Sequence, residues 1–156
     1  MMKKKKRKKR TPVAIAKDNL WETFSIYTRT RDCIRTTGTI EYGLCISCSK
    51  PYPFKKLQAG HFIPGRRNSN LFYERGCHAQ CYNCNINLKG NLLNYMDALI
   101  KLYYPEIIEE LRENDRQRLK FIEVDLREHN IYYKDEIRKL KETSCEQVAE
   151  QLQTGS

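Results

Sequence analysis

A mostly helical α+β fold, with a small metal-held core and flanking helices, is predicted by three features of the sequence. Helical periodicity dominates both ends of the chain, whereas the middle consists of short apolar segments broken by proline and glycine. Two Cys-x-x-Cys pairs, separated by 32 residues, lie in this middle part. Because the chain has only 156 residues and 31% of them are charged, it can bury a modest core, and a bound metal would add needed stability.

The pattern divides the chain into four segments. We expect residues 1–17 to be a disordered basic arm, 18–43 an N-terminal helical segment, 44–92 the metal-held core and 93–153 a helical extension. No internal repeat of useful length is present.

The ends of the helices are predicted from capping residues and apolar spacing. Asp18 is the expected N-cap of the first helix, which covers residues 19–35 and ends at Gly38. The next helix is expected over residues 91–104. Pro105 suits the first turn of another helix, whose Ile107, Ile108 and Leu111 should face inward. A last helical pattern begins at Leu119 and is expected to break near Asn130.

The core between these helices should contain a strand pair followed by a helix. Residues 57–63 read as a strand that ends at a turn-rich loop, and residues 71–74 read as its return strand. Gly76 would break that strand. A helix is expected to start near residues 79–81 and to carry Cys84 and Asn85 in its first turns.

Positive charge is concentrated in the first two thirds of the chain. Residues 1–10 contain eight bases and no acid, residues 11–100 contain 11 bases and 6 acids, and residues 101–156 contain 10 bases and 13 acids. A basic arm in front of a basic core favours a polyanionic partner, most simply nucleic acid.

Cysteine usage favours metal binding over disulfides. No apolar run is long enough to cross a membrane, and no apolar segment of a secretory signal follows the basic N-terminus, so we expect a reducing compartment and no membrane partner. The chain has seven cysteines, an odd number, and four of them form the two short pairs.

The four paired cysteines predict a structural zinc site. Cys45, Cys48, Cys81 and Cys84 provide the tetrahedral thiolate set that zinc prefers. Cys77 or His78 could replace one of the four. A closed four-cysteine site has no position for water, so any catalysis must take place elsewhere.

His61 and Asn85 are the candidate reactive residues beside this site. His61 lies on the predicted strand, and Asn85 directly follows the last zinc ligand, so the metal would fix its position. A lone histidine is more often structural, but this context raises the chance of a functional role.

These motifs together resemble the NinG (Rap) recombination proteins of lambdoid phages, and more broadly the zinc-containing HNH (ββα-metal) nucleases. The resemblance covers about residues 18–142. Its core is carried by Cys45-Ile46-Ser47-Cys48, Ala59-Gly60-His61, Phe72-Tyr73-Glu74-Arg75, His78-Ala79-Gln80-Cys81, Cys84-Asn85 and Gly90-Asn91-Leu92.

The resemblance implies a zinc-stapled, HNH-like ββα-metal core and a DNA endonuclease that cuts branched recombination intermediates, such as Holliday junctions and D-loops. By match, His61 would be the general base, and Asn85 would help to hold a catalytic Mg²⁺ or Mn²⁺. His78 would orient phosphate or metal, or else support the zinc site. The protein would act in the cytoplasm of a bacterial host, encoded by a phage or prophage.

The sequence departs from the general HNH pattern at two positions. Gly60 stands where many HNH nucleases have an acidic or histidine ligand, although NinG-like proteins also have glycine there. Gly76 stands where the pattern has an asparagine that braces the loop and the catalytic histidine. Asn68 or Asn70 could take over that bracing role.

The candidate DNA contacts are bases near the predicted site. Four residues could hold phosphates on either side of the cut: Arg66, Arg67, Arg75 and Lys89. No base-reading helix is evident, which favours recognition of DNA shape. A homodimer would suit a two-fold symmetric junction.

Two functions of another class compete with the nuclease hypothesis. One is a non-catalytic, zinc-stabilised DNA-binding module with a degenerate HNH site. The other is a zinc-stabilised protein-interaction domain, which the basic arm disfavours.

Overall fold

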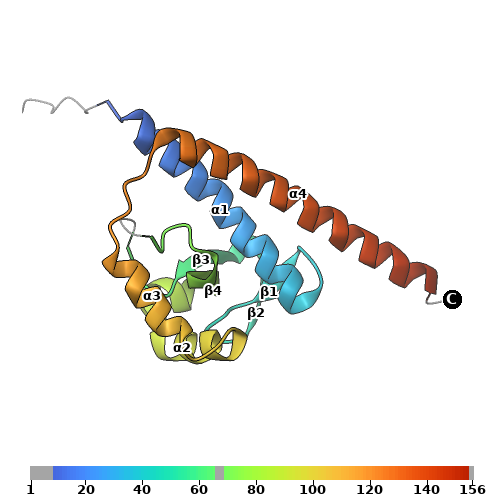
Figure 1. The fold of residues 1–156 in the computed structure, drawn as a ribbon. Helices are drawn as coiled ribbons and strands as arrows, with labels where there is room; N and C mark the ends of the chain where they lie inside the picture. The colour runs from blue at the N-terminus through green and yellow to red at the C-terminus, as the bar shows by residue number, and fades with distance from the viewer. Residues whose placement is uncertain (1–8, 66–68, 155–156) are drawn as a thin grey trace, which may run out of the picture.

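Two long helices lie side by side, and two small sheets and two shorter helices pack beneath them in the computed structural model (Figure 1). The structure describes residues 9–65 and 69–154, and the side chains only as far as residue 144. The helices are α1 (Pro12–Thr37), α2 (Leu92–Leu102), α3 (Ile107–Arg116) and α4 (Glu123–Thr154). The strands are β1 (Tyr42–Leu44), β2 (Pro51–Pro53), β3 (Leu57–His61) and β4 (Cys77–Cys81). The α+β class and its mostly helical content are therefore confirmed.

Helix α1 begins earlier than the sequence predicts. Thr11 is the N-cap, because its hydroxyl accepts a hydrogen bond from the Ala14 amide at 3.2 Å, and Pro12 follows it in the first turn. The expected start at Asp18 is wrong, and residues 12–17 belong to the helix, whereas residues 1–8 of the predicted arm lie outside the described residues. The predicted end is confirmed, since Gly38 adopts the left-handed conformation (φ 72°).

The main core lies between α1 and α4. Phe24 of α1 meets Tyr133 of α4 edge-on, with ring centroids 5.1 Å apart, and Leu20 and Leu126 are buried in the same cluster. Helix α4 continues without interruption through Asn130, so the predicted break there is wrong. Buried residues on both sides of Asn130 pack against α1, and this packing holds the helix together.

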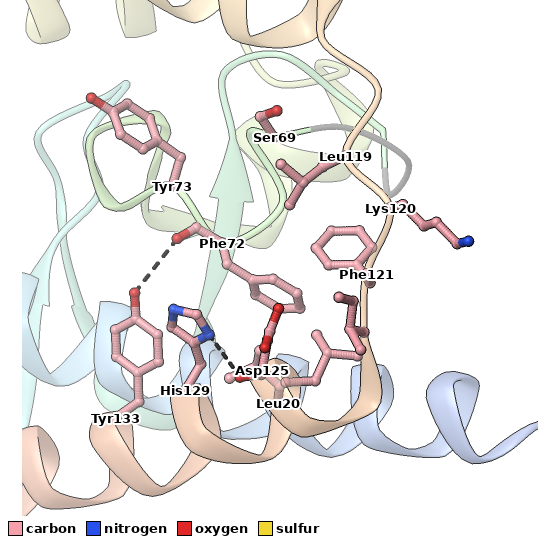
Figure 2. Close-up of a pocket in the computed structure, with 12 residues that line it drawn as sticks. Leu20, Ser69, Phe72, Tyr73, Leu119, Lys120, Phe121, Asp125, His129 and Tyr133 are labelled. Carbon is pink, nitrogen blue, oxygen red and sulfur yellow. Dashed lines mark hydrogen bonds between the residues drawn. The ribbon is translucent and has the colours of Figure 1, made fainter.

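A pocket of about 230 Å³ opens beside this core, where the segment that starts at Ser69 meets α4 (Figure 2). Aromatic and aliphatic side chains line most of it, and the Tyr133 hydroxyl donates to the Phe72 carbonyl at 3.5 Å. The imidazole in its lining, His129, bonds to the Asp125 carbonyl of its own helix at 2.8 Å. The pocket is thus an extension of the α1–α4 packing and not a cluster of reactive groups.

Each sheet contains two antiparallel strands. Strand β1 pairs with β2, and β3 pairs with β4 in a register that sets His61 opposite Cys77. The predicted return strand at residues 71–74 is therefore wrong, because the return strand is β4. All five residues of β4 are buried, so the strand lacks the alternation of polar and apolar residues that marks a half-exposed strand.

Helices α2 and α3 form a second core under the β3–β4 sheet. Tyr95 and Leu99 of α2 are fully buried against Ile107 and Leu111 of α3, as the sequence predicts for α3. The Tyr95 hydroxyl donates to the Gly60 carbonyl at 2.8 Å and so ties this core to β3. No helix within the described residues is long and apolar enough to span a membrane.

Asp32 connects α1 to β4 through a buried ionic network. Its carboxylate, 1% exposed, accepts hydrogen bonds from the Ala79 amide at 2.7 Å and from His78 Nδ1 at 3.0 Å. Arg31 donates to the same carboxylate at 3.0 Å and to the Cys77 carbonyl at 2.8 Å. Burial alone would raise the pKa of Asp32, but its interactions with His78, Arg31 and Arg35 outweigh burial and hold the pKa well below the usual range.

Replacing Asp32 by asparagine should destabilise the fold strongly. The substitution keeps the shape but leaves Arg31 without its counter-charge and turns an amide group toward hydrogen-bond donors, which should cost about 3–5 kcal/mol. Urea unfolding of the zinc-loaded protein measures this loss. The matched control is Asp97→Asn on the exposed face of α2, which should change stability by less than about 0.5 kcal/mol. Equal effects of the two substitutions would contradict the role of Asp32.

Candidate metal centre and active site

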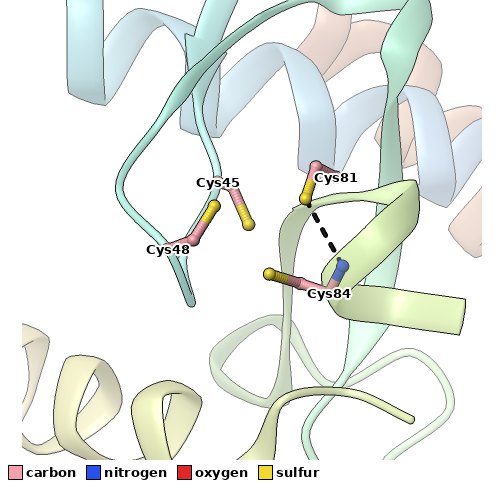
Figure 3. A group of neighbouring side chains, drawn as sticks. All are labelled: Cys45, Cys48, Cys81 and Cys84. Atoms are coloured by element: carbon pink, nitrogen blue, oxygen red, sulfur yellow. Dashed lines mark hydrogen bonds between the residues drawn. The ribbon is translucent and has the colours of Figure 1, made fainter. Parts of the chain in front are cut away.

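The four cysteines of the two short pairs meet at one point. Their Sγ atoms all lie within 4.8 Å of one another (Figure 3). Cys45 and Cys48 come from the loop between β1 and β2, Cys81 ends β4, and Cys84 lies in the short π-helical turn Asn83–Asn87. Zn–S bonds of about 2.3 Å in a tetrahedron set sulfur atoms about 3.8 Å apart, so a cluster whose Sγ atoms all lie within 4.8 Å of one another is of a size that suits zinc.

Hydrogen bonds orient two of the thiols and favour the ionised form of Cys81. The Cys84 amide donates to Cys81 Sγ and the Asn91 side chain donates to Cys84 Sγ, both at 3.4 Å. Burial raises the pKa of Cys81, but the Cys84 amide and the Tyr52 hydroxyl lower it to a net value of about 7. Thiolates are the form that zinc binds, and four of them close the coordination sphere. The donor set therefore fits a structural zinc ion.

The two rival ligands lie elsewhere. Cys77 is fully buried in the α1–α4 core, where burial raises the pKa of its thiol to about 12. His78 is also fully buried, with Nε2 at 3.1 Å from the Tyr103 hydroxyl and Nδ1 on Asp32. Burial lowers the pKa of His78, and Asp32 opposes this shift only in part, so we treat the imidazole as a neutral donor to Asp32. The imidazole is thus engaged in the core and not in the thiol cluster.

His61 lies at the end of β3 and is held on two sides. Its ring stacks on Trp21 of α1, with centroids 5.1 Å apart and planes 23° from parallel. Nε2 lies 2.9 Å from the Leu71 carbonyl. Because a carbonyl oxygen only accepts, this bond requires the proton on Nε2, and in the neutral ring Nδ1 then carries the lone pair.

The loop that supplies this carbonyl is braced by the residue before it. The buried side chain of Asn70 donates to the Leu111 carbonyl of α3 at 2.8 Å. A Cβ at Gly76 would lie 2.8 Å from Leu111 Cδ2, so α3 occupies the space that a larger residue would need. The glycine at position 76 therefore reflects packing against α3, and Asn70 fastens the loop instead. The other candidate for this role, Asn68, lies outside the described residues.

Asn85 lies on the turn next to the thiol cluster and faces β3. Its Nδ2 donates to Gln58 Oε1 at 2.8 Å. The helix expected to start near residues 79–81 is replaced by this turn, since β4 extends to Cys81. Asn85 lines an open groove of about 360 Å³ together with Gln58 and with Trp21, the residue on which His61 stacks. His61 thus stacks on Trp21, and Trp21 lines the same groove as Asn85.

Two oxygen atoms converge beside Gly60. A Cβ at this position would lie 2.0 Å from Gln80 Oε1 and 3.1 Å from Asn85 Oδ1. Gln80 is fully buried, and within residues 9–65 and 69–154 its Oε1 has no hydrogen-bond partner. Hard divalent cations bind oxygen ligands, so an orphaned amide oxygen next to a second one fits Mg²⁺ or Mn²⁺. The departure from the HNH pattern at Gly60 has a steric reason, because the Gln80 side chain fills the space.

The predicted basic residues are distributed unevenly around the groove. Arg75 is exposed but engaged by the Tyr104 hydroxyl, in the segment before α3, at 2.6 Å and by Glu110 of α3 at 3.5 Å. Lys89 is exposed in the turn after Asn85. Arg66 and Arg67 lie outside the described residues.

Sequence reasoning missed the contribution of α1 to the groove. Trp21, Ser25 and Arg29 line it from one face of this helix. Their spacing of four residues is the signal that could have revealed them, because residues at i and i+4 share a helix face. The helical spacing of apolar residues predicts only a core position for Trp21, and Gln80 has no role of its own in the motif that contains it.

Comparison with known families places these observations in context. The chain matches the family described as "NinG: Bacteriophage Lambda NinG protein" over residues 1–143. No curated protein and no solved structure matches the chain.

Purified protein should contain about one zinc ion per chain, because the cluster supplies one complete set of four ligands. Cys81→Ser should lower the zinc content and the helical circular dichroism signal together, since zinc binding is coupled to folding. Inductively coupled plasma mass spectrometry and circular dichroism measure both.

The matched control is Cys77→Ala, which removes a buried thiol outside the cluster. This variant should keep its zinc, although the cavity lowers stability. Loss of zinc in Cys77→Ala with retention in Cys81→Ser would overturn the assignment of ligands.

Proposed function

The chain belongs to the NinG family, and from this premise we propose that it is a metal-dependent endonuclease that cuts branched DNA. Membership indicates a function related to phage recombination. Branched intermediates such as Holliday junctions and D-loops are the substrates that this process generates. The proposal assigns an HNH-like active site to the groove between α1, β3 and the turn that carries Asn85.

The observation that carries the proposal is the way His61 is held beside this groove. Its Nε2 is engaged by the Leu71 carbonyl, which leaves Nδ1 as the basic nitrogen of the neutral ring. Trp21 supports the face of the ring. A histidine fixed in this tautomer suits a general base, whose proton-accepting atom must be oriented before the reaction.

Each residue around His61 has a separate role in the proposed hydrolysis. His61 Nδ1 takes a proton from a water molecule, and the oxygen of that water attacks the scissile phosphate. The bond between phosphorus and the leaving sugar oxygen then breaks, and solvent water protonates that oxygen. As the proton moves, the Leu71 carbonyl stabilises the imidazolium through the Nε2 hydrogen bond. Trp21 keeps the ring from rotating away.

Asn85 would hold a divalent cation at the phosphate. When bound, Mg²⁺ or Mn²⁺ stabilises the negative charge that builds up on the phosphate oxygens. The turn that carries Asn85 is fixed at Cys84 by the thiol cluster, and Gln58 orients its amide. His78 contributes indirectly in this scheme, because it joins β4 to Asp32 inside the core.

DNA binding is assigned to the basic residues that border the groove. Arg29 lines it from α1, with its guanidinium 4.5 Å from the centroid of the Phe54 ring, and Lys89 lies on the turn after Asn85. We retain Arg66 and Arg67, which follow β3 in the sequence, as further phosphate contacts. Arg75 would have to leave Glu110 in order to bind DNA. A homodimer would place two such grooves on a two-fold junction.

One observation favours a non-catalytic DNA-binding module as the second candidate. None of the described residues that line the groove is a carboxylate, although acidic ligands are common in sites for Mg²⁺ and Mn²⁺. In that case the zinc-held groove would bind branched DNA without cutting it.

Cleavage of a labelled four-way junction in Mn²⁺ or Mg²⁺ tests the proposal. The His61→Ala variant should lose on the order of 10²–10⁴-fold in cleavage rate, because it removes the general base. His61→Gln, which keeps a donor for Leu71 but has no basic nitrogen, should lose a similar factor. Zinc content and thermal unfolding verify that both variants are folded.

The matched control is His129→Ala, which removes the exposed histidine of α4 and should cut normally. Normal cleavage by His61→Ala would refute the general base. A wild-type protein that binds junctions but never nicks them would establish the binding module.

A further inference from the structure

We propose that Gln80 is a second protein ligand of the divalent cation, and that its Oε1 acts with Asn85 Oδ1 in the space left by Gly60. This inference rests on the proposed function, because it concerns the same cation. It adds a residue on β4 that the sequence pattern did not mark as functional.

The direction of the Gln80 side chain is fixed by hydrogen bonds at its other end. Nε2 donates to the Ser47 hydroxyl at 2.7 Å and to the Gly90 carbonyl at 2.8 Å. The Gly90 carbonyl can only accept, so turning the amide over would set Oε1 against that carbonyl oxygen and lose this hydrogen bond. Oε1 must therefore point toward Gly60.

These anchors belong to the zinc module. Ser47 lies between Cys45 and Cys48, and the Gly90 amide donates to the Cys84 carbonyl at 2.9 Å. Each cysteine pair thus supplies one support for Gln80. The zinc ion would orient Gln80 and Asn85 together, even though it takes no part in the reaction.

A fully buried hydrogen-bond acceptor without a partner indicates that a ligand binds to it. Buried amide oxygens are nearly always hydrogen-bonded or bound to an ion. Gln80 is fully buried, and its Oε1 has no partner within the described part of the chain. The neighbouring Asn85 Oδ1 is also an acceptor, because the Nδ2 of that side chain is engaged by Gln58. One cation can bind both of these converging oxygen atoms, whereas a single hydrogen-bond donor satisfies the two acceptors less well.

The glycine at position 60 agrees with this arrangement. Its backbone is not in the left-handed region that favours glycine, so conformation alone does not require it. Any side chain would collide with Gln80 Oε1, which lies 2.0 Å from the Cβ position. Glycine thus allows an amide from β4 to occupy the place where many HNH nucleases have a ligand on the first strand.

Two neutral amide oxygens bind a divalent cation weakly, so water and the DNA phosphate would complete the shell. Mn²⁺ alone is the probe, added to zinc-loaded, full-length protein and measured by electron paramagnetic resonance. Gln80→Met should weaken the tightest Mn²⁺ site about 10-fold or more, and Gly60→Ala should do the same by displacing Oε1. The matched control is Gln117→Met at an exposed position, which should leave the affinity unchanged.

A second readout on the wild-type protein avoids dependence on the folding of these variants. In ¹H–¹⁵N spectra, low Mn²⁺ should broaden the side-chain amide signals of Gln80 and Asn85 before that of Gln117. Selective broadening supports the site. Two results would overturn the Gln80 ligand: Mn²⁺ broadening that spares the Gln80 signal, or unchanged Mn²⁺ affinity in a zinc-replete Gln80→Met protein. Oε1 would then be bonded to water or to a rotated Asn85 amide.

The two proposals can fail separately. In the first case, cleavage depends on His61 and on Mn²⁺, but Gln80→Met changes neither the cleavage rate nor the Mn²⁺ affinity. This result overturns the Gln80 ligand and supports the endonuclease. In the second case, Mn²⁺ binding depends on Gln80 but the protein never cuts DNA. This result supports Gln80 as a ligand and contradicts the proposed endonuclease activity.

Discussion

The meeting of four thiols at one point is the constraint on which the rest of the central region depends. The first pair lies on a loop between two three-residue strands. The second pair spans the end of β4 and the five-residue turn after it, and elements this short have little stability alone. Zinc would convert these weak elements into a rigid support, since its binding free energy contributes directly to folding. Asn85 and Gln80 each lie one residue from a cysteine of the second pair, so a bound zinc ion would position both amides.

A second clamp holds the same strand from the other side. Asp32 of α1 binds the Ala79 amide and His78, whereas the thiol cluster holds Cys81. Strand β4 is therefore fixed at its middle and at its end, and its pairing with β3 sets the position of His61 opposite Cys77. The buried ion pairs of Asp32 act mainly by specifying this register, because buried charges gain little net energy over apolar packing.

The sequence predicted those features that depend on local spacing. The cysteine cluster follows from two short pairs, the end of α1 from Gly38, and the inward face of α3 from its apolar periodicity. Prediction from the sequence failed mainly where long-range packing determines the structure. Strand β4 is buried throughout and shows no alternation. The start of α1, in contrast, has a local signal in Thr11 and Pro12, which the prediction passed over in favour of Asp18. The orphaned oxygen of Gln80 could not be predicted, because it exists only once β3, β4 and both cysteine pairs are assembled.

The contact between Trp21 and His61 gives the groove an intrinsic optical signal. Trp21 is the single tryptophan of the chain, so all indole emission comes from the ring that faces this imidazole. Indole emission is sensitive to groups in contact with the ring, so the emission of the unlabelled protein should change when the contact between Trp21 and His61 changes. The same emission should respond when a nucleotide enters the groove that Trp21 lines, which would make this protein its own fluorescent probe.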